Sequence, residues 1–408
     1  MIAHSSANPL LEIVRERLDK APMPASEFMA LALYHPDYGY YRGSKGRWGF
    51  GGKDYYTALD LGPLLGETIA CVLQRVWQDL DRPGCFTVLE PGAGRGWLGR
   101  DILRAAAGDF AQTIHYLHCD GNPAAKEEAS LALEPWINIG RASLVKQFGE
   151  IDSFVGAVVS NELFDALPAQ PWRWDGSSWA REALVSLSLK GQGLTAWEPS
   201  CPGEAGAWFS KHAEGGLQPG DGSVWAGQLP QILTDICRPL QKGLFLTIDY
   251  GDSADRLIAK GADLRRYRGH EVDGQWWASP GECDITADVD FTRLAHLLKG
   301  LGLTVGPFAK RQFCKAAEFS SSAGRDQRSG CALAQASGNA ALAASPPEKP
   351  VSLGRWTRAN APLAQWENQW AELPQPERDR RRQNLLHLAF PSTMGDRFKV
   401  LQAFKEWS

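Results

Sequence analysis

A run of alternating glycines constrains the fold of this chain more than any other feature. The run is Glu90-Pro-Gly-Ala-Gly-Arg-Gly96, and residues 86–90 lead into it as a β-prone segment. Residues 96–107 then show a helical pattern. Glycines let the backbone approach a ligand closely because they carry no Cβ atom. We therefore expect a strand, a tight turn and a helix, with a ligand bound at the turn.

Two classes of cofactor fit this turn. The segment from Gly94 to Gly99 matches G-x-G-x-x-G, which cradles the pyrophosphate of a dinucleotide. The longer pattern E-x-G-x-G-x-G is typical of class I methyltransferases that use S-adenosylmethionine (SAM). Glu90 favours SAM, because its carboxylate would repel a pyrophosphate but suits a cationic cofactor. Asp120, at the end of the next predicted strand, can accept hydrogen bonds from ribose hydroxyls in either class. A nicotinamide-dependent oxidoreductase is therefore the alternative from another class of enzyme.

The rest of the chain alternates between strand and helix patterns, which predicts a parallel sheet with helices on both faces. We expect strands over 86–90, 113–120, 155–160 and 244–249, two short helices within 8–34, and further helices over 64–80, 96–107, 123–133 and 290–301. Residues 171–227 are rich in glycine and tryptophan and predict an antiparallel β insertion. Residues 320–350 predict a loop because they are rich in serine, alanine and glycine, and the last fifty residues look helical.

These patterns predict an α/β fold with a Rossmann-like sheet of the class I methyltransferase type, an N-terminal helical segment, a β-rich insertion and a helical C-terminal extension. The expected segments are 1–80 (helices and lid), 81–170 (first part of the SAM-binding core), 171–227 (insertion), 228–318 (core completion and acceptor side) and 319–408 (loop and C-terminal helices). Tyr38, Tyr40 and Tyr41 fit either a lid over the cofactor or packing of the N-terminal helices.

A polar segment follows the third predicted strand, where a doubly wound sheet binds ligands. Its sequence is Asn161-Glu-Leu-Phe-Asp-Ala-Leu-Pro168. Asn161 and Phe164 have the N-x-x-F spacing of amino methyltransferases, in which a polar side chain and an aromatic face hold the target nitrogen. Glu162 and Asp165 could pair bidentately with a planar guanidinium and orient it. The structural alternative is that Asn161 and Asp165 cap the next helix and Phe164 lies in the core.

Six segments in order resemble the MidA family of SAM-dependent methyltransferases. They are Tyr34-His-Pro-Asp-Tyr-Gly-Tyr-Tyr41, Asp54-Tyr-Tyr-Thr-Ala58, Glu90-Pro-Gly-Ala-Gly-Arg-Gly96, Asn161-Glu-Leu-Phe-Asp-Ala-Leu-Pro168, Ile248-Asp-Tyr-Gly251 and Asp284-Ile-Thr-Ala-Asp-Val-Asp-Phe291. The resemblance implies SAM as the cofactor and methylation of an arginine nitrogen in a protein substrate, with a subunit of respiratory complex I as the candidate. The alternative within the family is a SAM-binding assembly factor without turnover.

The resemblance also implies roles for individual residues. Residues expected to bind SAM are Glu90, Gly92, Gly94, Gly96 and Asp120, together with Asp54 and Thr57 on a closing loop. Residues expected at the acceptor are Asn161, Glu162 and Asp165 as catalytic groups and Phe164, His270 and Asp284 as substrate contacts. Asp288 stands where the family often has histidine.

Composition limits the partners and the location. The chain has 43 Lys and Arg against 47 Asp and Glu, so its net charge of −4 gives no general electrostatic reason to bind nucleic acid. Its 8 cysteines are scattered without a C-x-x-C pair, which predicts free thiols and no metal site. No apolar stretch is long enough to span a membrane, and the first residues do not resemble a signal or transit peptide. We therefore expect a cytoplasmic protein without membrane insertion, and the sequence leaves its oligomeric state open.

Overall fold

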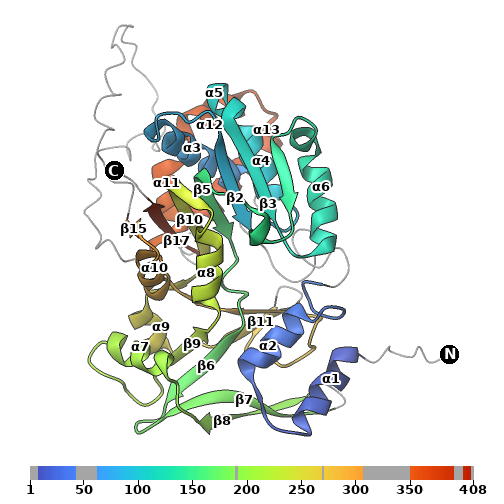
Figure 1. Cartoon of the computed structure of the whole chain (residues 1–408), viewed down its shortest axis with the longest axis vertical. Coiled ribbons are helices and arrows are strands. Elements are labelled where there is room, and N and C mark those ends of the chain that lie inside the picture. The colour runs from blue at the N-terminus through green and yellow to red at the C-terminus, as the bar shows by residue number, and fades with distance from the viewer. Residues whose placement is uncertain are drawn as a thin grey trace, which may run out of the picture.

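The computed structural model describes residues 8–42, 62–188, 192–268, 271–306, 350–389 and 398–405. A mixed sheet flanked by helices forms one part of the molecule, and the N-terminal helices with an antiparallel sheet form the other (Figure 1). Because the chain passes between the two parts several times, they are built from interleaved segments rather than from two consecutive halves.

The core sheet contains the predicted parallel strands and several strands that the sequence did not reveal. In spatial order its main strands are β15 (Leu303–Val305), β17 (Phe398–Lys405), β10 (Leu240–Asp252), β5 (Phe154–Asn161), β2 (Phe86–Pro91), β3 (Ile114–Cys119) and β4 (Ala142–Val145). The strands from β10 to β4 are parallel to one another, whereas β17 runs antiparallel to both β10 and β15. Two short strands, β14 (Val289–Asp290) and β16 (Val351–Ser352), pair with β10 and β17.

Helices cover both faces of this sheet, as the alternating pattern predicts. Every residue of β2 is buried, which is the burial expected for a parallel strand covered on both sides. The helices packed on one face are α3 (Leu64–Asp79), α4 (Trp97–Ala105), α5 (Gly108–Thr113), α11 (Leu353–Asn360), α12 (Leu363–Ala371) and α13 (Gln375–Ala389), with α6 (Pro123–Ile137) at the β4 edge. The helices packed on the other face are α8 (Leu229–Cys237) and α10 (Phe291–Gly300).

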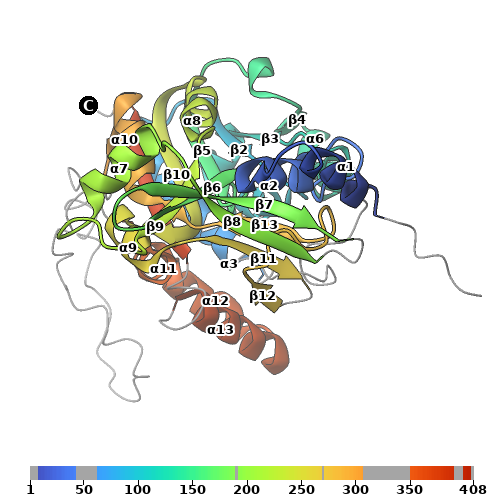
Figure 2. The same cartoon turned by 90° about the horizontal axis from the view of Figure 1, so that it is seen from below.

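The predicted β insertion is confirmed as an antiparallel sheet. Its strands are β6 (Ala169–Trp174), β7 (Trp179–Leu187), β8 (Gly193–Pro199) and β9 (Gly222–Ala226), and the N-terminal β1 (Met23–Pro24) joins it beside β7. The N-terminal helices α1 (Pro9–Leu18) and α2 (Ala25–Tyr34) lie against this sheet (Figure 2). On another side it packs on α7 (Glu204–His212) and α9 (Ala254–Lys260). A third sheet has the order β12 (Glu271–Asp273), β11 (Leu264–Arg268), β13 (Asp284–Ala287).

The C-terminal extension contains the expected helices but ends in a strand that the sequence did not predict. Residues 350–389 do form α11 to α13, but β17 returns to the core sheet and fills the gap between β10 and β15. Its register runs from Gly243 opposite Lys405 to Tyr250 opposite Phe398. The cause is tertiary, because the open edge of β10 offers a full row of backbone partners that a short apolar segment can satisfy. The five segment boundaries given above remain predictions.

Two further expectations concern the whole chain. Six of the cysteines lie in the described residues and all of these are free, while Cys314 and Cys331 fall outside that part of the chain. Among the helices of the described ranges, none combines the length and the apolar composition needed to cross a bilayer.

Candidate cofactor and acceptor site

A cavity of about 470 Å³ lies where β2, β3 and β5 end. The carboxyl ends of parallel strands are the usual place for a ligand in an open α/β sheet. Its lining residues are Tyr34, Tyr41, Arg42, Glu90, Gly92, Ala93, Gly94, Arg95, Trp97, Cys119, Asp120, Gly121, Asn122, Lys146, Gln147, Phe148, Asn161, Glu162, Leu163 and Ala166. The glycine turn and the start of the acceptor segment therefore face the same space.

The three glycines of the turn all need a left-handed backbone but serve different purposes. Their φ angles are +66° at Gly92, +50° at Gly94 and +71° at Gly96, which side chains rarely tolerate. Gly92 and Gly94 line the cavity, and a Cβ atom on Gly94 would meet nothing within 4 Å. A Cβ atom on Gly96 would lie 3.1 Å from the Cβ of Ala129 on α6. The position of a Cβ atom on Gly96 therefore faces α6, and Gly96 does not line the cavity, so its expected contact with the cofactor remains a prediction.

This difference predicts that alanine substitutions at Gly94 and Gly96 differ in their effect on SAM affinity. Gly94→Ala places a methyl group at the cavity wall, so we expect SAM affinity to fall by about tenfold or more, equal to ~1.4 kcal/mol. Gly96→Ala presses on α6, so we expect ~1–3 kcal/mol lower stability and SAM affinity within about threefold in the folded protein. Calorimetric titration with SAM and urea unfolding of both variants measure the two effects. Equal losses of SAM affinity would contradict the assignment.

Glu90 places a carboxylate with an unused oxygen at the cavity. Its side chain is 4% exposed, and its Oε2 atom has no hydrogen-bond partner among the described residues. Burial, with a smaller contribution from the Asp120 carboxylate, raises the pKa of Glu90 well above its ordinary value of 4.5. A buried acid without a partner is costly unless a ligand supplies one. A cationic group such as the amino group of SAM fits this position.

Asp120 both fastens the turn and faces the cavity. Its Oδ2 accepts a hydrogen bond of 2.9 Å from the Gly94 N–H, and its Oδ1 accepts one of 2.7 Å from the Asn122 N–H. His118 Nε2 lies 2.7 Å from the carbonyl oxygen of Gly94, so both polar groups of that glycine are held. A carboxylate has about four lone-pair sites, which leaves capacity for ribose hydroxyls.

The acceptor segment presents Asn161 and Glu162 to the same cavity. The Asn161 Nδ2 atom donates a hydrogen bond of 2.8 Å to Glu162 Oε1, while its Oδ1 atom is buried and unpaired within the described residues. Glu162 has a φ of +52°, an uncommon backbone conformation for a residue other than glycine. Such conformations persist where the surrounding structure enforces them and gather at functional sites. The two side chains are thus held in place at the cavity wall.

Asp165, Phe164 and Asp284 lie behind the cavity wall and do not line it. The Phe164 ring is buried in the core cluster under α8 and α10 and does not line the cavity, so its expected contact with the substrate remains a prediction. Asp165 is buried, and its burial, together with the carboxylates of Asp249, Asp284 and Glu162, raises its pKa well above the ordinary value, while Arg265 lowers it. Asp284 accepts a 2.9 Å hydrogen bond from the Tyr41 hydroxyl.

Three predicted site residues, Asp54, Thr57 and His270, lie outside the described residues, so their roles remain predictions.

The segment after α2 forms a wall of the cavity that the sequence analysis only partly anticipated. The Tyr34 hydroxyl donates to the Ala166 carbonyl at 2.8 Å, and Arg42 Nη1 donates to the Gly121 carbonyl at 2.9 Å. Tyr41 lines the cavity, whereas Tyr40 is buried with the N-terminal helices. One tyrosine of this segment thus faces the cavity and another packs with the N-terminal helices, while a lid over the cofactor remains a prediction. Lys146, Gln147 and Phe148 were missed because they follow β4, a strand the sequence did not reveal.

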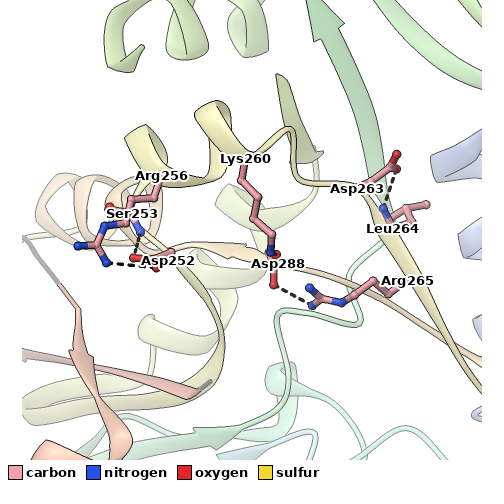
Figure 3. Close-up of polar contacts among 8 residues, drawn as sticks. All are labelled: Asp252, Ser253, Arg256, Lys260, Asp263, Leu264, Arg265 and Asp288. Atoms are coloured by element: carbon pink, nitrogen blue, oxygen red, sulfur yellow. Dashed lines mark hydrogen bonds and ion pairs between the residues drawn. The ribbon is translucent and has the colours of Figure 1, made fainter. Parts of the chain in front are cut away.

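Asp288 organises the charged groups beside the acceptor segment (Figure 3). It accepts from Arg265 Nη2 at 2.7 Å and from Lys260 Nζ at 3.1 Å, and so ties β11 and the end of α9 to the turn before β14. Burial alone would raise the pKa of Asp288, but these two cations lower it below the ordinary value. Arg265 is therefore already paired where it approaches Asp165.

Three features together define a SAM-dependent methyltransferase. They are the order of the strands in the sheet, the glycine turn, and the carboxylates of Glu90 and Asp120 beside the cofactor cavity. The chain belongs to the family described as "Putative S-adenosyl-L-methionine-dependent methyltransferase", whose model matches residues 68–308. This match confirms the resemblance to the MidA family and SAM as the cofactor, and it removes the nicotinamide alternative.

Named relatives and a solved structure agree with this family. The chain is 27% identical over 318 residues to the mitochondrial protein arginine methyltransferase NDUFAF7 homolog of Caenorhabditis elegans, covering 72% of each protein. It is 25% identical over 354 residues to the human protein arginine methyltransferase NDUFAF7, covering 76% of this chain and 74% of that protein. A Burkholderia thailandensis protein crystallised with S-adenosyl-homocysteine shares the fold, with a TM-score of 0.76, 22% identity and coverage of 98% and 93%.

The comparison corrects the expected location. The curated relatives are named as mitochondrial proteins, so the expectation of a cytoplasmic protein is wrong on this evidence. That expectation used the absence of a leader-like pattern in the first residues, which carries little information about where related proteins act.

Proposed function

We propose that this methyltransferase transfers a methyl group to an arginine nitrogen of a protein substrate. The observation that carries the proposal is a group of four carboxyl side chains beside the cavity, Glu162, Asp165, Asp249 and Asp284. Arg265 is the cation that opposes them at Asp165, and Asp288 already pairs with it. The names of the relatives as protein arginine methyltransferases support the same acceptor.

This cluster of four carboxyl groups favours a guanidinium over an ammonium group as the methyl acceptor. A lysine must lose its proton before it can attack, and neighbouring carboxylates oppose that loss. A guanidinium is planar and stays charged, and bidentate pairing with carboxylates draws its positive charge away from the attacking nitrogen. Binding a cation also relieves the repulsion among the buried acids. The cluster therefore favours an arginine side chain.

The proposed roles follow from where the residues lie. Glu90 holds the cationic end of the cofactor and Asp120 its ribose, while Gly92 and Gly94 leave room for it. SAM supplies an electrophilic methyl group when bound. Asn161 and Glu162 orient the acceptor nitrogen at the cavity wall, and Asp165 and Asp284 add negative charge behind them. Positioning and electrostatics then carry the transfer, as displacement at a methyl carbon requires.

Arginine methylation in cells with and without the gene tests the proposal. We expect mass spectrometry to find arginine sites whose methylation disappears on deletion and returns with the wild-type gene. A subunit of respiratory complex I is the substrate class that the family resemblance suggests. Changed methylation at another residue type, with arginine sites unaffected, would overturn the arginine assignment. Rescue of all phenotypes by a Glu162→Gln protein that binds SAM without turnover would favour the assembly-factor alternative.

A further inference from the structure

The acceptor segment leaves the core sheet immediately after β5. Its last ladder bond runs from the Glu162 N–H to the Ile248 carbonyl at 2.9 Å. The next two N–H groups have no strand partner. Both donate to one atom, Oδ2 of Asp249, at 3.1 Å from Leu163 and 2.8 Å from Phe164. A single side chain on β10 therefore replaces the missing strand at the point where the segment turns into the cavity.

Asp249 is well placed to hold the backbone of the acceptor segment. Its side chain is fully buried, and it does not line the cavity. Its other oxygen, Oδ1, accepts a 2.8 Å bond from the Tyr250 N–H. Three backbone donors thus depend on one carboxylate, and buried N–H groups without a partner are costly. Hydrogen bonds to an ionised acceptor are about twice as strong as neutral ones, so this arrangement holds the segment firmly.

Glu162 sits between the last ladder bond and the two bonds to Asp249. Its φ of +52° is a conformation that a glutamate rarely adopts unless its neighbours enforce it. The fixed groups on either side are the Ile248 carbonyl and the Asp249 carboxylate. Releasing the second of them would let Glu162 relax to a negative φ and swing away from Asn161.

We propose that Asp249 is a positioning residue for methyl transfer, which holds Asn161 and Glu162 toward the cavity without touching cofactor or substrate. This inference rests on the proposed function of the acceptor site, and it adds a residue outside the cavity to that function.

A pH dependence supports the same assignment. Burial raises the pKa of Asp249 to about 7, although the N–H groups of Phe164, Tyr250 and Leu163 oppose the shift. Below that pH the carboxyl group is neutral and one oxygen carries a proton, so its hold on the segment weakens. The titratable groups facing Asp249 are Asp165 and Tyr250, with Glu162, Asp284 and Arg265 acting on Asp165 in turn. Turnover should therefore fall on the acidic side of pH 7.

Asp249→Asn tests the proposal with a side chain of the same shape. The amide oxygen can still accept from Leu163 and Phe164, but its NH2 group then faces the Tyr250 N–H. We expect kcat for the acceptor to fall by about 30-fold, the SAM Kd to stay within about threefold, and the acidic limb of the kcat profile near pH 7 to disappear. Backbone amide exchange of Leu163 and Phe164 should be at least about tenfold faster than in the wild type.

Thr247→Val is the matched control on the same strand. The Thr247 hydroxyl accepts a 2.8 Å bond from the buried Ser160 hydroxyl, one register position before the acceptor segment. This variant also loses a buried polar contact between β5 and β10, but the contact does not hold residues 162–164. We expect a lower melting temperature with kcat within twofold of the wild type and unchanged exchange at Leu163.

The outcomes separate the inference from the proposed function. Wild-type kcat, an intact acidic limb and unchanged amide exchange in Asp249→Asn would show a merely structural role and overturn the inference. Failure of the wild-type protein to methylate arginine would instead overturn the proposed function, while the exchange measurement still decides the role of Asp249. Should the asparagine variant not fold, Asp249→Glu supports the same measurements, because its longer carboxylate still accepts but displaces the segment.

Discussion

Glu90→Gln should weaken SAM binding strongly, by up to about 100-fold, while leaving the protein without SAM equally or more stable. The buried Oε2 of Glu90 has no partner in the described structure, so a cationic ligand group gains a charge-assisted hydrogen bond there. Hydrogen bonds to charged groups contribute ~1.5–3 kcal/mol, so we expect a loss of affinity approaching 100-fold. Calorimetric titration with SAM measures this effect directly.

The opposite sign for stability follows from the raised pKa of Glu90. The carboxyl group ionises at a higher pH in the folded protein than in the unfolded chain. Its ionisation therefore lowers the free energy of unfolding as the pH rises above 4.5, and the neutral glutamine removes that cost. Urea unfolding without SAM at pH 7 should show an equal or higher free energy of unfolding, whereas SAM should no longer raise the melting temperature.

Glu182→Gln provides the control for both measurements. Glu182 is also a buried glutamate whose pKa burial raises, but it accepts a hydrogen bond from Trp276 Nε1 at 3.0 Å and lies away from the cavity. It should leave SAM affinity unchanged, and because burial raises its pKa as well, its free energy of unfolding at pH 7 should also be equal or higher. If Glu90→Gln binds SAM within threefold of the wild type, the assigned role of Glu90 is wrong.

Asp165→Asn should remove most methyl transfer without affecting the cofactor. We expect kcat/KM for the acceptor to fall at least about 100-fold, because the change removes one of the buried negative charges behind the wall that a bound cation faces. SAM affinity should stay within about threefold, since Asp165 does not line the cavity. Steady-state kinetics on an arginine-containing substrate and titration with SAM measure the two effects separately.

The pH profile adds a check on the charge of Asp165. Burial, with Asp249, Asp284 and Glu162, raises its pKa, which favours the neutral acid as the pH falls. A neutral acid adds no negative charge behind the wall that a guanidinium faces, and kcat/KM should therefore rise with pH in the wild type. That rise should be smaller in Asp165→Asn. Normal methylation in both Asp165→Asn and Glu162→Gln would remove these carboxylates from the acceptor site.

Local sequence patterns predicted most of the cofactor half of the site. The alternate glycines, the acid before them and Asp120 belong to one strand–turn–helix unit and the strand beside it, so their geometry depends on neighbours in the sequence. Gly96 shows the limit of this reasoning, because its close contact is with Ala129 on α6. The sequence shows that a glycine can adopt a left-handed backbone conformation. It does not show which neighbouring helix or strand will pack against that glycine.

The acceptor half depended on contacts between distant residues. Asn161 and Glu162 were placed correctly because a strand end predicts where they emerge. Phe164 lies in the core, and spacing alone does not show whether an aromatic ring faces a ligand or the core. Asp249 was missed as a site residue, although it lies in a segment typical of the family. Its partners are more than eighty residues earlier in the chain, and only the pairing of β10 with β5 brings them together.

The antiparallel strand β17 has a consequence for synthesis of the protein. One edge of β10, the strand that carries Asp249, stays open on the ribosome until residues 398–405 have emerged. From the synthesis of β10 until that of β17, a nascent chain must protect an exposed hydrogen-bonding edge, and pairing with other chains is then a hazard. The protein therefore becomes catalytically competent only after β17 has been translated. Prematurely terminated products would carry the cofactor-binding residues without a complete sheet to support them.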